Sequence, residues 1–226
     1  HNIFAFFLVL LPGFLIVSQP DLGTGSMLIL LGFAIIFLNG LSRNVILSIT
    51  LVSLISIPVI WQNLLEYQKY RILVFLNPEL DTLGKGYQIM QSKIAIGSGG
   101  MFGKGYLTGS QSRLDFLPEK HTDFVYTLIS EEMGFIGSMS LLILYFIIII
   151  ILMREFLKEE HITNKIIIFG ISFLIFLYVI FNVGMVSGLI PVVGAPLPFI
   201  SNGGTSLITI FIGLGIIQSI RVSRNV

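Results

Sequence analysis

The chain alternates long apolar blocks with polar connections. Six apolar blocks stand out, over residues 3–17, 22–41, 45–61, 124–153, 166–186 and 206–220. An α-helix needs about 20 residues to cross a bilayer, and most of the blocks approach that length. Inside lipid the backbone must satisfy its own hydrogen bonds, which favours helices over open strands. The pattern therefore predicts one all-α domain over residues 1–226, a polytopic bundle of six transmembrane helices.

One connection, residues 62–122, is much longer than the others. A structureless loop of this length is uncommon and is usually functional. Its middle, residues 87–97, places apolar residues at helical spacing beside polar ones, which predicts a short helix lying on the membrane surface. Glycines at 97–100 and 103–105 should then interrupt regular structure.

Basic residues gather in every second connection and after the last block. They are Arg43, then Arg154, Lys158 and Lys165, and finally Arg221 and Arg224. Segments 18–21 and 187–204 contain no lysine or arginine. The positive-inside rule predicts a cytoplasmic C-terminus and an extracytoplasmic loop 62–122. The seven basic residues of that loop do not oppose this orientation, because long loops cross the membrane largely regardless of charge.

Composition supports the membrane interpretation. Hydrophobic residues make up 54% of the chain and charged residues 11%, whereas a soluble domain carries about 25% charged residues. The formal net charge of +1 does not predict a nucleic-acid partner. The absence of cysteine excludes disulfides and thiolate metal sites, and the three histidines are not spaced as zinc ligands.

The start of the chain indicates missing sequence. It begins at His1 rather than methionine, and its first block is short for a full span. No basic segment or small-residue cleavage site indicates a signal peptide. We therefore expect a fragment of a longer protein that lacks its N-terminal portion.

Asp123 lies where the long loop ends and the fourth block begins. In a straight helix starting there, at about 100° per residue, Thr127, Ser130 and Gly134 share its face. A small and polar stripe faces protein or water rather than lipid, so Asp123 should point into the bundle or a cavity. Glu131 would lie at the edge of this face. The pattern alone leaves open a catalytic carboxylate and a helix N-cap.

A second carboxylate, Asp21, precedes the second block after a proline. It could cap that helix or hold a divalent cation near a phosphate. Three loop cations could neutralise an anionic ligand or simply be solvated at the surface: Lys93, Lys104 and Arg113. The Gly-Gly pairs at 99–100 and 203–204 could present backbone N–H groups to phosphate.

The last outer segment, residues 191–204, holds three prolines and three glycines and cannot continue a helix. Irregular backbone at this depth must be buried in protein or line a cavity. By residue type alone, His121 is a structural hydrogen-bonding group, and Glu119 with Lys120 forms a solvated surface pair of small energy.

Several motifs, taken together and in order, resemble the SEDS family of shape, elongation, division and sporulation proteins. They occupy residues 19–24, 91–100, 116–124, 131–134 and 182–204, and the likeness extends over essentially the whole chain. The residues at 182–188 and 191–194 look like the elongation branch rather than the division branch. Asn202 departs from the family pattern, which has tyrosine there, and this puts local packing or a substrate contact in question.

The resemblance implies a ten-helix fold of which these are the last six helices. It implies a peptidoglycan glycosyltransferase that polymerises lipid II, a disaccharide-pentapeptide on undecaprenyl pyrophosphate, during cell elongation and rod-shape maintenance. The site would lie at the outer face of the bacterial cytoplasmic membrane. Because the missing helices help to form the substrate cavity, the resemblance does not imply activity for the fragment alone.

The family's catalytic aspartate maps onto Asp123. Further substrate-binding candidates are Lys93, Gln111, Glu119, His121, Ser201, Gly203 and Gly204. A divalent cation, Mg²⁺ or Mn²⁺, is the expected cofactor, with Asp21 as its candidate ligand. The expected partner is a class B penicillin-binding protein within the cell-wall elongation complex. Small residues on blocks four and five would admit its transmembrane helix: Gly137, Ser138, Gly170 and Ser172.

A single carboxylate is sufficient for the glycosyl transfer that the resemblance implies. An acceptor hydroxyl must lose a proton as it attacks the anomeric carbon, and a carboxylate within about 3 Å can take it. Pyrophosphate leaves without protonation if cations stabilise it. Two other functions stay open: a flippase for the same lipid, which would place charges at mid-depth in the membrane, and a non-catalytic scaffold. The acidic residues cluster at the outer helix ends, which favours chemistry there.

Overall fold

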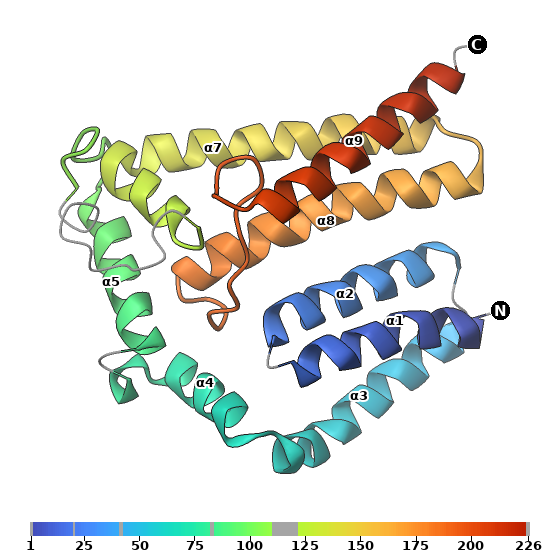
Figure 1. Cartoon of the computed structure of the whole chain (residues 1–226), viewed down its shortest axis with the longest axis horizontal. Coiled ribbons are helices and arrows are strands. Elements are labelled where there is room, and N and C mark those ends of the chain that lie inside the picture. Colours follow the sequence, from blue (N-terminus) through green and yellow to red (C-terminus); the bar gives the residue numbers. More distant parts are fainter. Residues whose placement is uncertain (1, 20, 41–42, 82–83, 110–121, 225–226) are drawn as a thin grey trace.

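The computed structural model describes residues 2–19, 21–40, 43–81, 84–109 and 122–224 (Figure 1). Within these ranges regular structure is helical, with no strand. The elements are α1 Asn2–Ser18, α2 Leu22–Leu38, α3 Arg43–Asn63, α4 Glu66–Leu76, the 3₁₀ helix η1 Pro78–Leu80, α5 Lys85–Ser98, α7 Val125–Lys158, α8 Ile162–Val186 and α9 Gly204–Arg224.

The six apolar blocks correspond to α1, α2, α3, α7, α8 and α9, and the short helix expected in the long connection is α5. Within the described ranges, α7, α8 and α9 are long and apolar enough to cross a membrane, whereas α1 and α2 have 17 residues each. An all-α, polytopic membrane bundle is therefore confirmed. The total of six spans stays a prediction.

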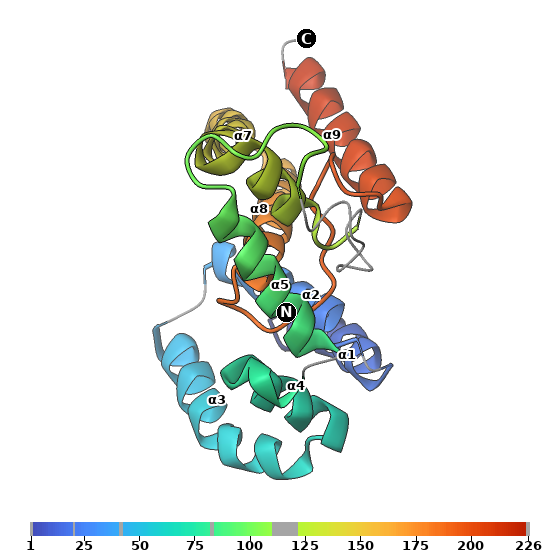
Figure 2. The same ribbon diagram turned by 90° about the vertical axis from the view of Figure 1, so that its left-hand side faces the viewer.

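Helix α8 is at the centre of the bundle, because it contacts α2, α5, α7 and α9. The α1–α2 hairpin packs through α2 against α8, and α7 lies antiparallel to α8 (Figure 1). Figure 2 shows α3 and α4 apart from α7–α9, with α5 rising from α4 to the start of α7. Many outward side chains are large and apolar, such as Phe14 and Ile55, at 68% and 73% exposed. A lipid environment accounts for this surface.

Helix α7 is broken at Gly134, whose φ of 66° and ψ of −161° are non-helical. The straight-helix projection is therefore wrong beyond this residue. Instead of continuing one stripe, the chain turns so that the Ser138 hydroxyl donates to the Ser130 hydroxyl over 2.8 Å. Glu131, expected at the edge of the polar face, is fully buried, with an exposed fraction of 0%. Thr127, expected on the inner face, is fully buried.

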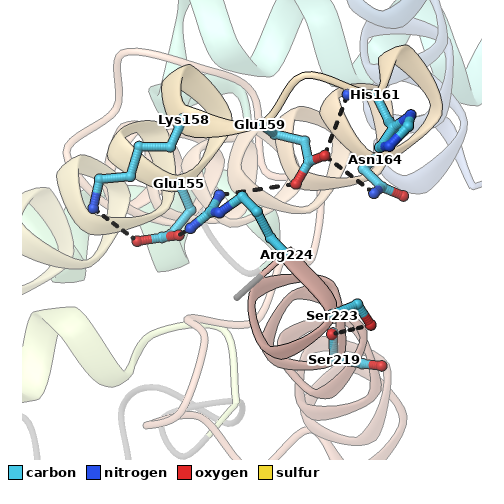
Figure 3. Close-up of polar contacts among 8 residues, drawn as sticks. All are labelled: Glu155, Lys158, Glu159, His161, Asn164, Ser219, Ser223 and Arg224. Atoms are coloured by element: carbon cyan, nitrogen blue, oxygen red, sulfur yellow. Dashed lines mark hydrogen bonds and ion pairs between the residues drawn. The ribbon is translucent and has the colours of Figure 1, made fainter. Parts of the chain in front are cut away.

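The end of the bundle that holds the α7–α8 turn is tied by ion pairs (Figure 3). Arg224 at the end of α9 contacts Glu155 over 2.5 Å and Glu159 over 3.8 Å. Lys158 also pairs with Glu155, and the Asn164 amide donates to Glu159. These contacts fix the C-terminal end of α9 to the turn between the two longest helices.

Candidate functional site

The backbone around Asp123 is held by side chains from two other parts of the chain. The side-chain amide of Asn182, near the end of α8, donates to the Asp123 carbonyl over 2.9 Å. The Ser201 hydroxyl donates to the preceding carbonyl, that of Thr122, over 2.5 Å. Phe124, next in sequence, is fully buried, while Asp123 itself is half-buried. The aspartate therefore sits on a fixed backbone at the edge of the core.

The segment between α8 and α9 forms the wall beside this aspartate. Asn182 also donates to the Ala195 carbonyl over 2.7 Å, and the Ser201 hydroxyl accepts from the Leu197 amide over 2.8 Å. A Cβ on Gly194, which has a φ of 68°, would lie 3.3 Å from the Asp123 carboxylate oxygen Oδ2. A glycine there lets the outer segment pass close to the carboxylate.

Helix α5 closes another side of the site. The Ser92 hydroxyl donates to the Val186 carbonyl over 2.8 Å and shares a 2.7 Å hydrogen bond with the Thr127 hydroxyl. Lys93 follows, and its Nζ lies 2.6 Å from the position that a Cβ on Gly188 would take. Its ammonium group therefore lies over the C-terminal end of α8, at the same end of the bundle as Asp123.

Among the described residues, the structure brings Lys93, Asp123 and Ser201 to one end of the bundle. Gln111, Glu119 and His121 lie outside the described residues. Gly204 begins α9, and the amide of the preceding Gly203 donates to the Ser201 carbonyl over 2.8 Å. In this arrangement that amide is engaged within the chain.

Asp21 acts as the N-cap of α2, because its carboxylate accepts from the Thr24 amide over 3.0 Å. A Cβ on Gly23 would lie 2.2 Å from the Val193 carbonyl oxygen, so this end of α2 is pressed against the outer segment. No group of three or more His, Cys, Asp or Glu side chains among the described residues is arranged to hold a metal ion. One carboxylate already used as a cap does not by itself make a cation site.

Lys104 and Glu131 form an ion pair that the sequence did not predict. Lys104 Nζ donates to Glu131 Oε1 over 2.8 Å, and the Glu131 side chain is fully buried. Lys104 therefore contacts an internal carboxylate, a role that the loop sequence does not indicate. The sequence signal for such a pair is Glu131 itself, because a carboxylate within an apolar helix indicates a charged or hydrogen-bonding partner.

A cavity of about 190 Å³ opens between α4, α5 and the outer segment. Its lining is largely apolar, with cations and one carboxylate among the residues Tyr67, Tyr70, Arg71, Val74, Phe75, Asp81, Lys85, Ile89 and Val192. Ile89 and Val192 also belong to the core cluster that contains Phe124. The cavity and Asp123 therefore share one packed region.

A larger cavity, of about 470 Å³, lies at the other end of α8. Its lining includes Glu159, His161 and Arg224, at the ion-pair cluster of Figure 3. Because this cavity is separated from Asp123 by the length of α8, we do not place the chemistry there.

The family described as Cell cycle protein, that of FtsW, RodA and SpoVE, matches residues 1–226. The chain is 44% identical over 222 residues to the peptidoglycan glycosyltransferase MrdB of Escherichia coli (strain K12). This match covers 98% of the chain and 60% of the relative, so the chain spans about three-fifths of the relative's length.

Two solved structures are similar. One comes from work on the structural coordination of polymerization and crosslinking by a peptidoglycan synthase complex, with a TM-score of 0.80 and 29% identity over 96% of this chain and 60% of that chain. The other is the rod shape determining protein RodA of Thermus thermophilus, with a TM-score of 0.59 and 26% identity over 95% of this chain and 54% of that chain. The chain belongs to the SEDS family, that of FtsW, RodA and SpoVE.

Proposed function

We propose that the protein is a peptidoglycan glycosyltransferase that polymerises lipid II during cell elongation, with Asp123 as its general base. The observation that carries this proposal is the fixed, half-buried Asp123 at one end of a membrane bundle, held by Asn182 and Ser201. The name of the Escherichia coli relative, a peptidoglycan glycosyltransferase, supports the reaction class.

In the proposed reaction, an acceptor sugar hydroxyl attacks the anomeric carbon of the donor. The new C–O bond forms as the bond to the pyrophosphate oxygen breaks, and the hydroxyl proton passes to the Asp123 carboxylate. Undecaprenyl pyrophosphate leaves with the bonding electron pair. The fixed backbone keeps the carboxylate in place, which reduces the entropic cost of reaching the transition state.

The cavity beside α4 and α5 suits one part of such a substrate. Its apolar wall could contact an isoprenoid chain, while Arg71 and Lys85 could contact the phosphates at its end. Lys93 is a further cation, which lies over the C-terminal end of α8 at the same end of the bundle as Asp123. We propose that these cations stabilise the leaving pyrophosphate.

A divalent cation stays a proposal. The described residues offer Asp21 as a single, capping carboxylate, so a cation held there would need its other ligands from the substrate or from residues outside the described ranges. We therefore assign no reaction step to a metal.

We propose that the protein resides in the bacterial cytoplasmic membrane with Asp123 outside and the C-terminus inside. The α7–α8 turn and the C-terminal end of α9 lie at one end of the bundle (Figure 1), joined by Arg224. This is the end with the short basic connections, which the positive-inside rule assigns to the cytoplasm.

We propose a class B penicillin-binding protein as partner, within a cell-wall elongation complex. The similar structure from a peptidoglycan synthase complex supports such a partnership. A groove of about 220 Å³ between α7 and α8 is lined by Ile149, Met153, Phe169, Ser172, Phe173 and Phe176. Its apolar surface could receive a single transmembrane helix.

Not all the small residues expected at this contact face outward. A Cβ on Gly170 would lie 3.4 Å from Ile35 of α2, so this glycine faces the hairpin. Ser138 donates to Ser130 within α7, whereas Ser172 lines the groove. The proposed contact therefore rests on the groove rather than on a stripe of four small residues.

Polymerisation of purified lipid II tests the function. The protein expressed from its own gene should make glycan, and Asp123→Asn should lower the rate by about 10²–10⁴-fold, the usual contribution of a general base. Lipid II binding and the melting temperature should change little. A flippase or scaffold predicts no glycan from the wild type. Near-normal polymerisation by a folded Asp123→Asn variant would overturn the assignment of the base.

A further inference from the structure

The break in α7 is filled by another part of the chain, the glycine loop (residues 99–105). Residues 125–133 and 135–158 form the two segments of α7 on either side of Gly134. Four backbone hydrogen bonds join the loop to the break: Lys104 N to Glu131 O at 3.0 Å, Gly105 N to Glu132 O at 3.0 Å, Phe135 N to Gly100 O at 2.8 Å and Ile136 N to Met101 O at 3.2 Å. The loop thus pairs backbone groups that the broken helix would leave without partners.

The two backbones are in direct contact because glycines occupy the contact points. A Cβ on Gly99 would lie 2.0 Å from the Ser130 carbonyl oxygen, and one on Gly103 would lie 2.1 Å from that of Glu132. A Cβ on Gly134 would lie 2.3 Å from the Gly103 amide nitrogen. Side chains at these positions would force the loop and the break apart.

The Lys104–Glu131 ion pair closes the same contact. Glu131 is 0% exposed and the Lys104 side chain is 30% exposed. Ion pairs buried in this way contribute little net stability, because removing both charges from water offsets their attraction. Their best-attested role is to select one arrangement over its alternatives. Here the pair joins the loop to residues 125–133 rather than to the long segment of α7.

Residues 125–133 are therefore held at both ends. Near their start, Ser92 of α5 bonds to Thr127 over 2.7 Å, and near their end Lys104 bonds to Glu131 over 2.8 Å. The Ser138 hydroxyl, from the long segment of α7, bonds to Ser130. Asp123 lies two residues before this short helix, so the helix direction sets where Asp123 points.

We propose that the glycine loop and the Lys104–Glu131 ion pair are a positioning device, which aims Asp123 by fixing the direction of residues 125–133. This inference rests on the proposed function of Asp123. Neither Lys104 nor Glu131 touches substrate in this role. Misplacement of a reacting group by about 1 Å can cost on the order of 10²-fold in rate.

The first test removes the ion pair in the protein expressed from its own gene. Glu131→Gln and Lys104→Met should each lower kcat for lipid II polymerisation by about 10²-fold, with little change in KM. Lys104→Arg keeps the charge and should restore most of the turnover. Glu132→Gln is the matched control, because the half-buried Glu132 contributes its backbone carbonyl to the contact. Its turnover should match the wild type.

The second test changes the loop without touching a charge. Gly99→Ala introduces a methyl group where the Ser130 carbonyl lies, whereas a Cβ on Gly97 meets nothing within 4 Å. Gly99→Ala should therefore lose turnover and Gly97→Ala should not. If Gly99→Ala does not fold, the two Lys104 variants decide the question, because that side chain is partly exposed.

A double-mutant cycle separates positioning from general stability. If Glu131 acts through Asp123, Glu131→Gln should cause little further loss in an Asp123→Asn background. The inference would be overturned if the rate losses of Glu131→Gln and Asp123→Asn multiplied in the double mutant. It would also be overturned if folded Glu131→Gln and Lys104→Met variants kept the wild-type kcat while Asp123→Asn was impaired. Full activity of Asp123→Asn would instead overturn the proposed function.

Discussion

The side-chain amide of Asn182 donates to two carbonyl oxygens, that of Asp123 over 2.9 Å and that of Ala195 over 2.7 Å. These carbonyls belong to segments far apart in the sequence, one at the start of α7 and one between α8 and α9. Asn182 itself is completely buried on α8. A single side chain on the central helix therefore sets the spacing between the candidate base and the wall beside it.

Asn182→Leu tests this relationship, because leucine has a similar size and no donor. The buried Ala195 carbonyl and the partly buried Asp123 carbonyl would lose a partner, and the loss at a buried carbonyl costs about 1–3 kcal/mol. We expect a lower melting temperature and a turnover at least about 10-fold lower, since Asp123 would no longer be fixed. Thermal melting and lipid II polymerisation measure the two effects.

Asn202→Leu is the matched control. Asn202 is exposed and lies in the same outer segment as Ala195. We expect its melting temperature to equal that of the wild type. Equal stability of the Asn182 and Asn202 variants would show that the two hydrogen bonds do not hold the segments together.

Cysteine labelling tests the orientation, since the chain contains no cysteine. Tyr106, 79% exposed, belongs to the long connection, and the exposed Thr163 lies in the first turn of α8. In intact spheroplasts, an impermeant thiol reagent should label Tyr106→Cys and leave Thr163→Cys unlabelled. After lysis both should react, which serves as the control. The opposite pattern in intact spheroplasts would place Asp123 in the cytoplasm.

Filling the α7–α8 groove tests the partner contact. Ile149→Trp would occupy the groove, and we expect it to reduce co-purification with the class B penicillin-binding protein several-fold. Leu144→Trp, at a 58% exposed position on the same helix, should leave co-purification unchanged. Equal recovery of the partner by both variants would show that the contact lies on another face of the bundle.

Chelation tests the divalent cation. If a cation stabilises the leaving pyrophosphate, excess EDTA should abolish polymerisation, and Mg²⁺ or Mn²⁺ should restore it. Asp21→Asn should raise the Mg²⁺ concentration needed for half-maximal rate while keeping the helix cap, because asparagine caps about as well as aspartate. An unchanged metal requirement would leave Asp21 with its capping role alone.

The positions of α1, α2, α3, α7, α8 and α9 could be predicted because each corresponds to a long apolar block of the sequence. The block at 166–186 ends at Val186, as α8 does, where Ser187 and Gly188 follow. The interruption of α7 could not be predicted, since a lone glycine is common within membrane helices. Gly134 adopts a positive φ because a distant loop supplies hydrogen bonds there, and periodicity contains no information about such a partner.

Some residues of the candidate site could likewise be predicted from the sequence, and others could not. Asp123 and Asp21 could be singled out because each carboxylate lies at a helix start, and Asp21 is indeed an N-cap. Asn182 could not be singled out, because its role depends on carbonyls that lie 59 and 13 residues away in the sequence. The sequence does not connect Lys104 with Glu131, because the two residues are 27 positions apart along the chain.

The break at Gly134 also divides α7 into a segment long enough to span the membrane and a short helix that follows Asp123. The segment 135–158 is about 36 Å long at 1.5 Å per residue, which exceeds a hydrocarbon core of about 30 Å. It can therefore span the bilayer without residues 125–133. The direction of residues 125–133, and with it the position of Asp123, is then set by contacts with α5 and the glycine loop rather than by the length that a membrane span requires.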